Sequence, residues 1–356
     1  MKKRWLGRLK NRPEVTPFKS PEMTRRQLLA MGSLGAAASL LTGRSARAEN
    51  PHRHALAQDF KHAHFGNLAR GEVDVSRFNP MTYLKDFDGG QVSKLPDGRT
   101  LREYFITSLD VDIEVAPGVT FPAWAYTSRT SRAALVPGPT LRATEGDLVR
   151  IHFTNAGSHP HTMHFHGFHS AGMDGVFELV HKGDTFVYEF VAEPFGLHLY
   201  HCHTPPLKRH IHKGLYGTFI VDPPAGRPAA NEMVMMLNAF DTNLDGENEV
   251  YAVNTVAHYY MRHPIVVKQN ELVRVYCVNI TEFDLINSFH SHATFFEEYR
   301  TGTKLQSDNF TDTIILGQGE RSILEFRYKD PGLYMFHAHV SEFAELGWAG
   351  MFEVVP

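Results

Sequence analysis

The sequence predicts an all-β protein made of two β-barrels of one type in tandem. From Leu101 onward the chain is a series of short runs with β propensity, separated by turns at Gly, Pro, Asn and Asp. Hydrophobic residues at helical spacing are scarce. The pattern of residues 146–155 returns at residues 270–279, and further matching segments follow both copies. A repeat of this length indicates two copies of one folded unit.

The first 48 residues predict an export signal rather than part of the fold. A basic segment ends in the arginine pair at 25–26, an apolar run covers 28–41, and Ala-Arg-Ala at 46–48 is a small-residue cleavage pattern. We therefore expect export by the twin-arginine route to the periplasm or the cell exterior. The apolar run is short and rich in Gly and Ala, so we expect no membrane span in the mature chain. An N-terminal membrane anchor is the alternative.

The rest of the chain divides into an extension and two barrels. We expect an N-terminal extension at 49–100, a first barrel at 101–224 and a second at 232–356, joined by the proline-rich linker DPPAGRPAAN. The extension holds four histidines: His52, His54, His62 and His64. They fit either a solvated arm or an additional metal site, and both interpretations stay open.

The charge balance excludes some partners. The first 48 residues hold 11 of the 36 basic and 2 of the 39 acidic side chains, so the remainder carries a net charge of −12. Such a surface disfavours nucleic acid and anionic lipid.

Histidines recur in pairs with one residue between them. With 22 histidines in 356 residues, chance gives only about one or two His-x-His pairs. The sequence has eight, and four of them fall at equivalent places in the repeat, two in each half. Regular placement of this kind indicates metal ligands.

The centre of the pattern is His201-Cys202-His203. In an extended strand alternate side chains point to opposite faces, so the two histidines face one way and the thiol faces the other. One short strand can therefore serve two metal sites. Cys277, in an alternating strand, is expected to be a packed core thiol that forms no disulfide with Cys202.

The thiol side of that strand predicts a blue-copper centre. The same face gathers His161, Cys202 and His210, and two imidazoles with a thiolate suit an electron-transfer copper. The axial position falls to Leu215, five residues after His210. Leucine cannot be a ligand, which predicts a three-coordinate copper. His212 is the alternative to His210.

The second half keeps only one of the two metal faces. The positions equivalent to the three thiolate-site ligands hold Asn287, Ala338 and Phe343, whereas both His-x-His pairs remain. Histidines without a function would not be expected to keep one complete ligand set while the other set is lost.

The motifs HTMHFHG, YHCH, FHSH and FHAH occur in this order, and the chain from Leu101 to the end resembles the multicopper oxidases. It looks most like their two-domain group with the blue copper in the first domain, in which each domain is a cupredoxin, a Greek-key β-barrel. The resemblance implies four coppers per subunit. It assigns type 1 copper to His161, Cys202 and His210, type 2 copper to His164 and His290, and the type 3 pair to His166, His201, His203, His292, His337 and His339.

The resemblance also implies the reaction. One-electron oxidation of a small reducing substrate or metal ion at the blue copper would feed reduction of O₂ to water at a trinuclear cluster. Asp174 resembles the family's proton-supplying acid, and Glu342 and Glu345 are further candidates. The family places the cluster between the first domain of one subunit and the second domain of the next, which implies a homotrimer.

Two other functions stay open at this point. A copper-containing nitrite reductase needs one blue copper and a type 2 copper with three histidines, so it does not require His203, His292, His337 and His339 in His-x-His form. A periplasmic copper carrier is the second alternative, although carriers favour exposed Met and His clusters. The reducing substrate is not readable from the sequence: phenols, metal ions and protein donors all remain.

Overall fold

The computed structural model describes residues 71–131 and 135–356. The predicted signal peptide and the four histidines at 52–64 lie outside these residues. Strands dominate the described part, and its helices are short, which confirms the all-β prediction. Among the described residues there is no helix with the length and apolar character needed to cross a bilayer.

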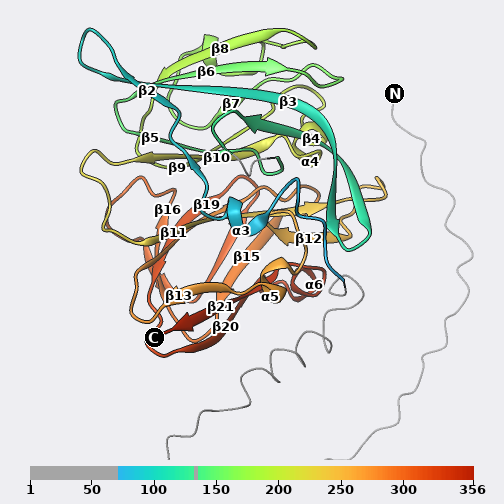
Figure 1. Ribbon diagram of the computed structural model, residues 1–356, viewed down its shortest axis with the longest axis vertical. Helices are drawn as coiled ribbons and strands as arrows, with labels where there is room; N and C mark the ends of the chain where they lie inside the picture. The colour runs from blue at the N-terminus through green and yellow to red at the C-terminus, as the bar shows by residue number, and fades with distance from the viewer. Residues whose placement is uncertain (1–70, 132–134) are drawn as a thin grey trace, which may run out of the picture. The chain divides into compact units, whose positions relative to one another are not determined.

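The first half holds ten strands and three short helical segments (Figure 1). Its strands are β1 (Phe87–Asp88), β2 (Gln91–Lys94), β3 (Thr100–Ala116), β4 (Val119–Ser128), β5 (Thr140–Thr144), β6 (Leu148–Asn155), β7 (His164–Phe165), β8 (Thr185–Val191), β9 (Gly196–His201) and β10 (Tyr216–Asp222). The helical segments are α3 (Pro80–Tyr83), the 3₁₀ turn η2 (Ala171–Met173) and α4 (Leu207–His212).

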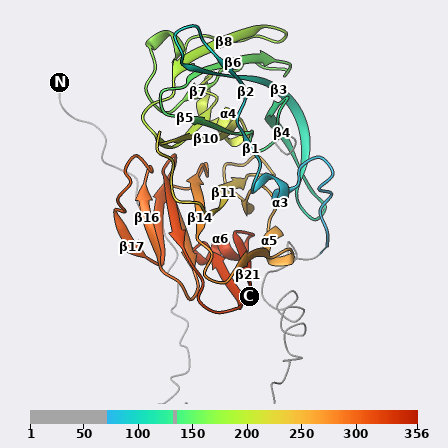
Figure 2. The ribbon, with the colours of Figure 1, turned by 60° about the vertical axis from the view of Figure 1, so that its left-hand side comes forward.

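The second half repeats this plan and ends the chain (Figure 2). Its strands are β11 (Asn231–Phe240), β12 (Val250–Val253), β13 (Ile265–Lys268), β14 (Val273–Asn279), β15 (Ile286–Ser291), β16 (Phe296–Arg300), β17 (Asn309–Thr311), β18 (Thr313–Gly317), β19 (Arg321–Phe326), β20 (Gly332–His337) and β21 (Ala349–Val355). The helices are α5 (Tyr259–Arg262) and α6 (Ser341–Glu345).

Each half is a pair of sheets. In the first half, the sheet β1-β5-β10-β9-β7 accompanies the sheet β2-β3-β6-β8, with β4 paired to β3. In the second half, the sheet β12-β11-β14-β19-β16-β17 accompanies β13-β21-β20-β15-β18. The pairings also repeat: β6 lies parallel to β3 and antiparallel to β8, as β14 does with β11 and β19. The prediction of two tandem cupredoxin-like barrels is thus confirmed, whereas their limits at 101–224 and 232–356 stay predictions.

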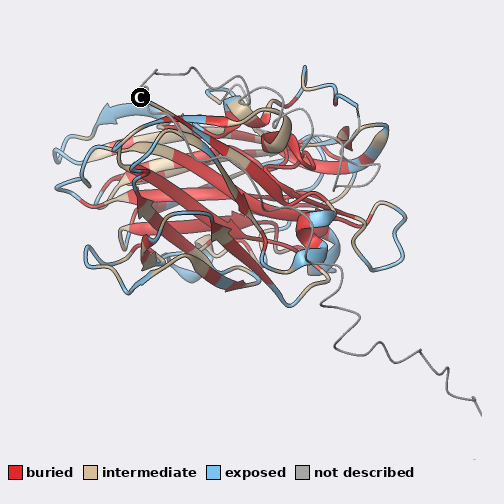
Figure 3. Cartoon of the chain, turned by 90° about the horizontal axis from the view of Figure 1, so that it is seen from below, coloured by how far each residue is buried: buried red, intermediate tan, exposed pale blue. Residues whose placement is uncertain are grey.

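The equivalent strands β6 and β14 differ in burial, and the difference shows where the halves meet. Side chains of β6 alternate between buried and partly buried, because its outer face is near solvent. All seven residues of β14 are buried. Figure 3 shows such buried strands running through the interior, with exposed residues mainly in the loops. A cluster that includes Leu197, Ile220, Tyr276 and Ile323 joins the two halves.

Polar contacts reinforce this apolar junction. The strand that carries the His-Cys-His triplet is held at its start, because Leu197 N–H donates to the Thr301 carbonyl at 2.7 Å. Arg321 Nε donates to the Leu197 carbonyl at 2.8 Å. In addition, Arg142 on β5 donates to Glu232 on β11 at 2.7 Å. The second half therefore fixes the position of β9.

Candidate metal centres

The end of β9 and the helix α4 build the first cluster. Cys202 Sγ lies 3.3 Å from His210 Nδ1 and 4.0 Å from His161 Nδ1. The two Nδ1 atoms lie 3.2 Å apart. All three side chains are buried. The structure thus brings together the three residues that the sequence predicts for the blue copper.

The imidazoles of this cluster are suited to bind a metal. Burial, together with the neighbouring His210 ring, lowers the pKa of His161 to about 3. Burial likewise lowers the pKa of His210 to about 4. Both rings are therefore neutral at ordinary pH, and neutral imidazole is the form that ligates metals. Moreover, the buried Nε2 of His161 has no hydrogen-bond partner among the described residues.

Leu215 closes the loop that follows the thiol. Its N–H donates to the His210 carbonyl at 3.3 Å, and its carbonyl accepts from the Cys202 N–H at 2.9 Å. The side chain is fully buried and has no donor atom. The predicted axial residue therefore lies in the hydrogen-bonded loop of the cluster.

His212, the alternative ligand, is occupied elsewhere. Its Nε2 accepts a hydrogen bond from Asp241 N–H at 3.2 Å. Its ring packs edge-on against Phe121 and Phe283. Of the two candidates, only His210 belongs to the thiol cluster.

Four histidines form a second cluster on the opposite face of β9. His164, His166 and His201 have ring nitrogens within 4.8 Å of one another. His203 stands beside them, with its ring centroid 5.4 Å from that of His164. Burial lowers the pKa of His166 to about 3 and that of His201 to about 4. The strand therefore serves two clusters, as the alternation of its side chains requires.

The second half builds the same arrangement from β15 and β20. His290, His292 and His337 have ring nitrogens within 4.8 Å of one another. The His339 ring centroid lies 5.4 Å from that of His290. The Nε2 atoms of His292 and His337 are 3.1 Å apart, against 3.3 Å for His166 and His201. The two groups of four are thus near copies.

Backbone carbonyls orient both groups in the same way. His164 Nδ1 donates to the Asp174 carbonyl at 2.7 Å, and His290 Nδ1 donates to the Asp312 carbonyl at 2.9 Å. A proton held at Nδ1 leaves the Nε2 lone pair free for a metal, which is the usual outer contact of a ligating histidine. The sequence did not single out Asp312, because only the pairing of β15 with β18 brings it to His290.

The predicted acids have different surroundings. Asp174 lies beside the first group, with Oδ1 3.2 Å from His164 Nδ1 and 3.7 Å from His169 Nε2. His169 is a further neighbour that the sequence did not single out. Glu342 and Glu345 are exposed on α6. Among the described residues, no group of potential metal ligands contains either glutamate.

The histidine groups are not joined within one chain. In the described part of the chain, every group of potential ligands takes its members from one half only. Exposed apolar side chains lie on the histidine-bearing strands, on neighbouring strands and in nearby loops: Phe168 and Phe177 in the first half, and Ile286, Phe295, Phe310, Ile315 and Leu333 in the second. His201 is buried, whereas the other seven histidines are partly or fully exposed.

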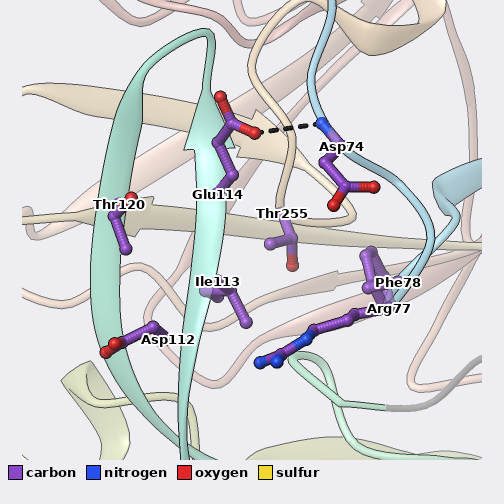
Figure 4. Close-up of a pocket in the computed structure, with 8 residues that line it drawn as sticks. All are labelled: Asp74, Arg77, Phe78, Asp112, Ile113, Glu114, Thr120 and Thr255. Atoms are coloured by element: carbon purple, nitrogen blue, oxygen red, sulfur yellow. Dashed lines mark hydrogen bonds between the residues drawn. The ribbon is translucent and has the colours of Figure 1, made fainter.

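A separate cavity of about 300 Å³ contains none of these ligands (Figure 4). It opens between residues 74–78, the hairpin of β3 and β4, and Thr255. Its lining combines charged side chains with the apolar Phe78 and Ile113. Glu114 accepts a hydrogen bond from Asp74 N–H at 3.0 Å. The candidate metal chemistry and this cavity are therefore different features of the molecule.

The donor sets fit copper. Two neutral imidazoles with one thiolate are the ligands of blue-copper centres, and groups of imidazoles suit copper of the other types. The fit is supported by the convergence of two Nδ1 atoms and one Sγ in a buried cluster. Copper bound there supplies one-electron chemistry.

Comparisons with known proteins agree with this chemistry. Two multicopper oxidase family models match residues 129–226 and 227–356. A crystal structure of a multicopper oxidase is 53% identical, with a TM-score of 0.76, covering 80% of this chain and 100% of that one. The copper nitrite reductase from Nitrosomonas europaea is 26% identical, with a TM-score of 0.64, covering 72% of this chain and 94% of that one.

Curated relatives include nitrite reductases as well. The copper-containing nitrite reductase of Neisseria gonorrhoeae is 28% identical over 253 residues, which cover 65% of this chain and 62% of that protein. The chain thus spans less than two thirds of the length of this relative. The family models and the structural relative at 53% identity agree on the copper chemistry. The chain belongs to the multicopper oxidase family.

Proposed function

We propose that the protein is a laccase-like multicopper oxidase. It would oxidise a reducing substrate by one electron at a type 1 copper and reduce O₂ to water at a trinuclear copper cluster. The observation that carries the proposal is the His201-Cys202-His203 triplet. Its thiol belongs to one cluster of potential ligands, and His201 belongs to another.

The chain's own residues would connect the two sites. Cys202 is bonded through the backbone to His201 and His203, so an electron arriving at the thiolate has only a short covalent path to the histidine group. His201 is further fixed because its Nδ1 donates to the Cys202 carbonyl at 3.0 Å. In the proposed assignment this subunit holds four coppers: one type 1, one type 2 at His164 and His290, and two type 3 at the remaining six histidines.

A complete cluster would require a second copy of the chain. His164 and His290 belong to different groups, and no group in the described residues combines the two halves. Apolar residues such as Phe177, which is 83% exposed, accompany the histidines, and exposed apolar patches commonly mark interfaces. Head-to-tail pairing of the first half with the second half of a neighbour closes into a ring, and we propose a homotrimer.

Asp174 is the best placed acid for proton supply. It lies beside His164 and His169, where the reduction of O₂ would consume protons. Glu342 and Glu345 are weaker candidates for proton supply, because they are exposed and belong to no group of potential metal ligands among the described residues. We also propose export to the periplasm or cell exterior, from the twin-arginine signal that the sequence predicts, and the reductant would be a small molecule or metal ion.

Copper-dependent nitrite reduction is the second candidate, because nitrite reductases are among the similar proteins. The full set of four histidines in each half favours the oxidase. A site with one blue copper and a type 2 copper with three histidines does not require His203, His292, His337 and His339 in His-x-His form.

Copper content with EPR and visible spectra separates the two functions. The oxidase predicts about four coppers per chain, one blue, one type 2 and an EPR-silent pair, and O₂ uptake with a one-electron donor. Two coppers per chain, both visible by EPR, with reduction of nitrite, would overturn the proposal. A monomer with full activity at micromolar concentration would overturn the trimer alone.

A further inference from the structure

Trp124 on β4 covers the thiol cluster. Its ring centroid lies 4.9 Å from that of His210 and 5.2 Å from that of His161. The ring of His159 also contacts it, at 4.5 Å between centroids. The strand is fixed at this point, because Trp124 N–H donates to the Lys213 carbonyl at 2.7 Å. One indole therefore contacts both candidate histidine ligands and a histidine outside the cluster.

The ligand rings have little contact with solvent. His161 is 0% exposed, His210 is 3% exposed, and Trp124 is also buried. His159 is partly exposed, and its Nδ1 lies 2.8 Å from the exposed Ser158 hydroxyl. A reductant at the surface therefore first meets His159, whose ring contacts that of Trp124.

Two cations lie over the indole. The Arg209 guanidinium carbon is 5.3 Å from the Trp124 ring centroid, and the Lys213 ammonium is 6.0 Å away. Such cation–π contacts stabilise the neutral ring. They also oppose formation of an indole radical cation, because a positive charge on the ring would repel them. The surroundings thus favour Trp124 as a bridge for electrons rather than as a site that is itself oxidised.

We propose that Trp124 is the residue through which electrons enter the His161–Cys202–His210 site. The reductant would lose one electron, which would cross the indole without residing on it and reduce a copper held by His161, Cys202 and His210. The indole forms and breaks no bond. This inference rests on the proposed function, because it requires a redox-active copper at the thiol cluster.

The geometry also selects the reductant. The rings of His161 and His210 are shielded by Trp124, so donors that must bind a ligand edge directly are disfavoured. Arg209 and Lys213 beside the indole are balanced by the carboxylates of Asp110 and Asp112, which interact with Lys213, so the local charge favours neither anions nor cations. An outer-sphere donor is therefore the class that this entry fits, and hexacyanoferrate(II) is a suitable probe.

The first test measures reduction without turnover. Air-free stopped-flow mixing of the copper-loaded protein with hexacyanoferrate(II) follows the loss of blue absorption in wild type, Trp124→Phe and Trp124→Leu. This anion is too bulky to enter the space left by leucine. We expect reduction to slow severalfold in Trp124→Leu and less in Trp124→Phe, with the blue spectrum, EPR signal and reduction potential retained. An unchanged rate with an intact spectrum would overturn the inference.

Trp348→Phe provides the matched control, because Trp348 is a buried tryptophan of the second half. It is expected to leave the reduction rate unchanged. If Trp124→Leu loses its blue spectrum, Trp124→Phe decides: a slower rate with an intact spectrum supports the inference, and a wild-type rate overturns it.

A second readout needs no electron transfer. Copper added to metal-free protein should quench the fluorescence of Trp124, and the quenched fraction should be smaller in Trp124→Phe than in wild type or in Trp348→Phe. Equal quenching in wild type and Trp124→Phe would place Trp124 away from bound copper and overturn the inference. A wild-type protein that binds no blue copper would instead overturn the proposed function.

Discussion

Leu215 and Trp348 occupy the same position in the two halves of the chain. Leu215 N–H donates to the His210 carbonyl, and Trp348 N–H donates to the Phe343 carbonyl at 2.8 Å. The carbonyl of Leu215 accepts from Cys202 N–H, as that of Trp348 accepts from Ala338 N–H. Each of them follows a glycine, Gly214 or Gly347, whose φ is positive. Residues with a side chain rarely adopt this backbone conformation, so the turn requires glycine.

The equivalence explains how the second half folds without a thiolate site. Phe343 and Ala338 stand where the first half has His210 and Cys202, and the fully buried Trp348 indole packs edge-on against Phe289. Large apolar side chains therefore fill the space that ligands and metal take in the first half. Apolar packing of this kind stabilises a barrel without any bound ion.

Replacing Leu215 with methionine should change the blue copper directly. A thioether at this position can act as the weak axial ligand that leucine cannot provide. We expect the reduction potential to fall by at least about 60 mV, which is a tenfold change in the one-electron equilibrium. Spectroelectrochemical titration measures it. A potential equal to that of wild type would mean that residue 215 does not face the copper.

Substitution of His210 and substitution of His212 on α4 should have different effects on the blue copper. His210→Ala removes a candidate ligand, and we expect loss of the blue absorption. His212→Ala removes a buried ring and its hydrogen bond from Asp241 N–H, at a cost of roughly 1–3 kcal/mol in unfolding free energy. Its blue spectrum should persist. Visible spectra and thermal unfolding of both variants check this, and loss of colour in His212→Ala alone would reverse the assignment.

Asp174→Asn should slow oxidation by O₂ and spare the blue copper. The asparagine keeps the backbone carbonyl that orients His164 but cannot release a proton, and proton transfer by a positioned acid contributes about 10²–10⁴-fold. Reoxidation of the reduced protein by O₂ in stopped flow measures the effect. Glu353→Gln at an exposed position of β21 is the control, with no change expected. Unchanged reoxidation in Asp174→Asn would remove Asp174 from the reaction.

Glu232 should make the junction of the two halves sensitive to acid. Burial alone would raise its pKa, but hydrogen bonds from Arg142, Tyr276 and Arg274 outweigh burial and hold it at about 2, below the ordinary value of 4.5. A carboxyl with a depressed pKa stabilises the fold above its ordinary pKa and loses that contribution as the pH falls from about 4.5 to about 2.

Glu232→Gln tests this relation. The free energy of unfolding of the variant should be roughly 2–3 kcal/mol lower than that of wild type at neutral pH, because Arg142 and Arg274 lose a buried anionic partner. The difference from wild type should shrink below pH 4.5. Chemical unfolding across the pH range measures both. A difference that stays constant down to pH 2 would show that the Glu232 charge does not stabilise the junction.

Local sequence was enough to predict which face of each strand carries ligands. In His201-Cys202-His203 the extended backbone requires the thiol and the imidazoles to separate, whatever the rest of the fold does. The repeat likewise predicted that the second half keeps one face and loses the other. Both arguments depend only on local geometry, and the structure places these residues accordingly.

The choice between His210 and His212 required the packing of α4 against the rest of the fold. Both lie on α4, where residues two apart point about 200° away from each other, so just one can face Cys202. Which one does so depends on how the helix is anchored by the Leu215 loop and the Asp241 backbone. For the same reason, the sequence could not predict that Trp124 and Asp312 lie beside the clusters. They meet the clusters through strand pairings and packing between distant segments, and such contacts leave no local pattern in the sequence.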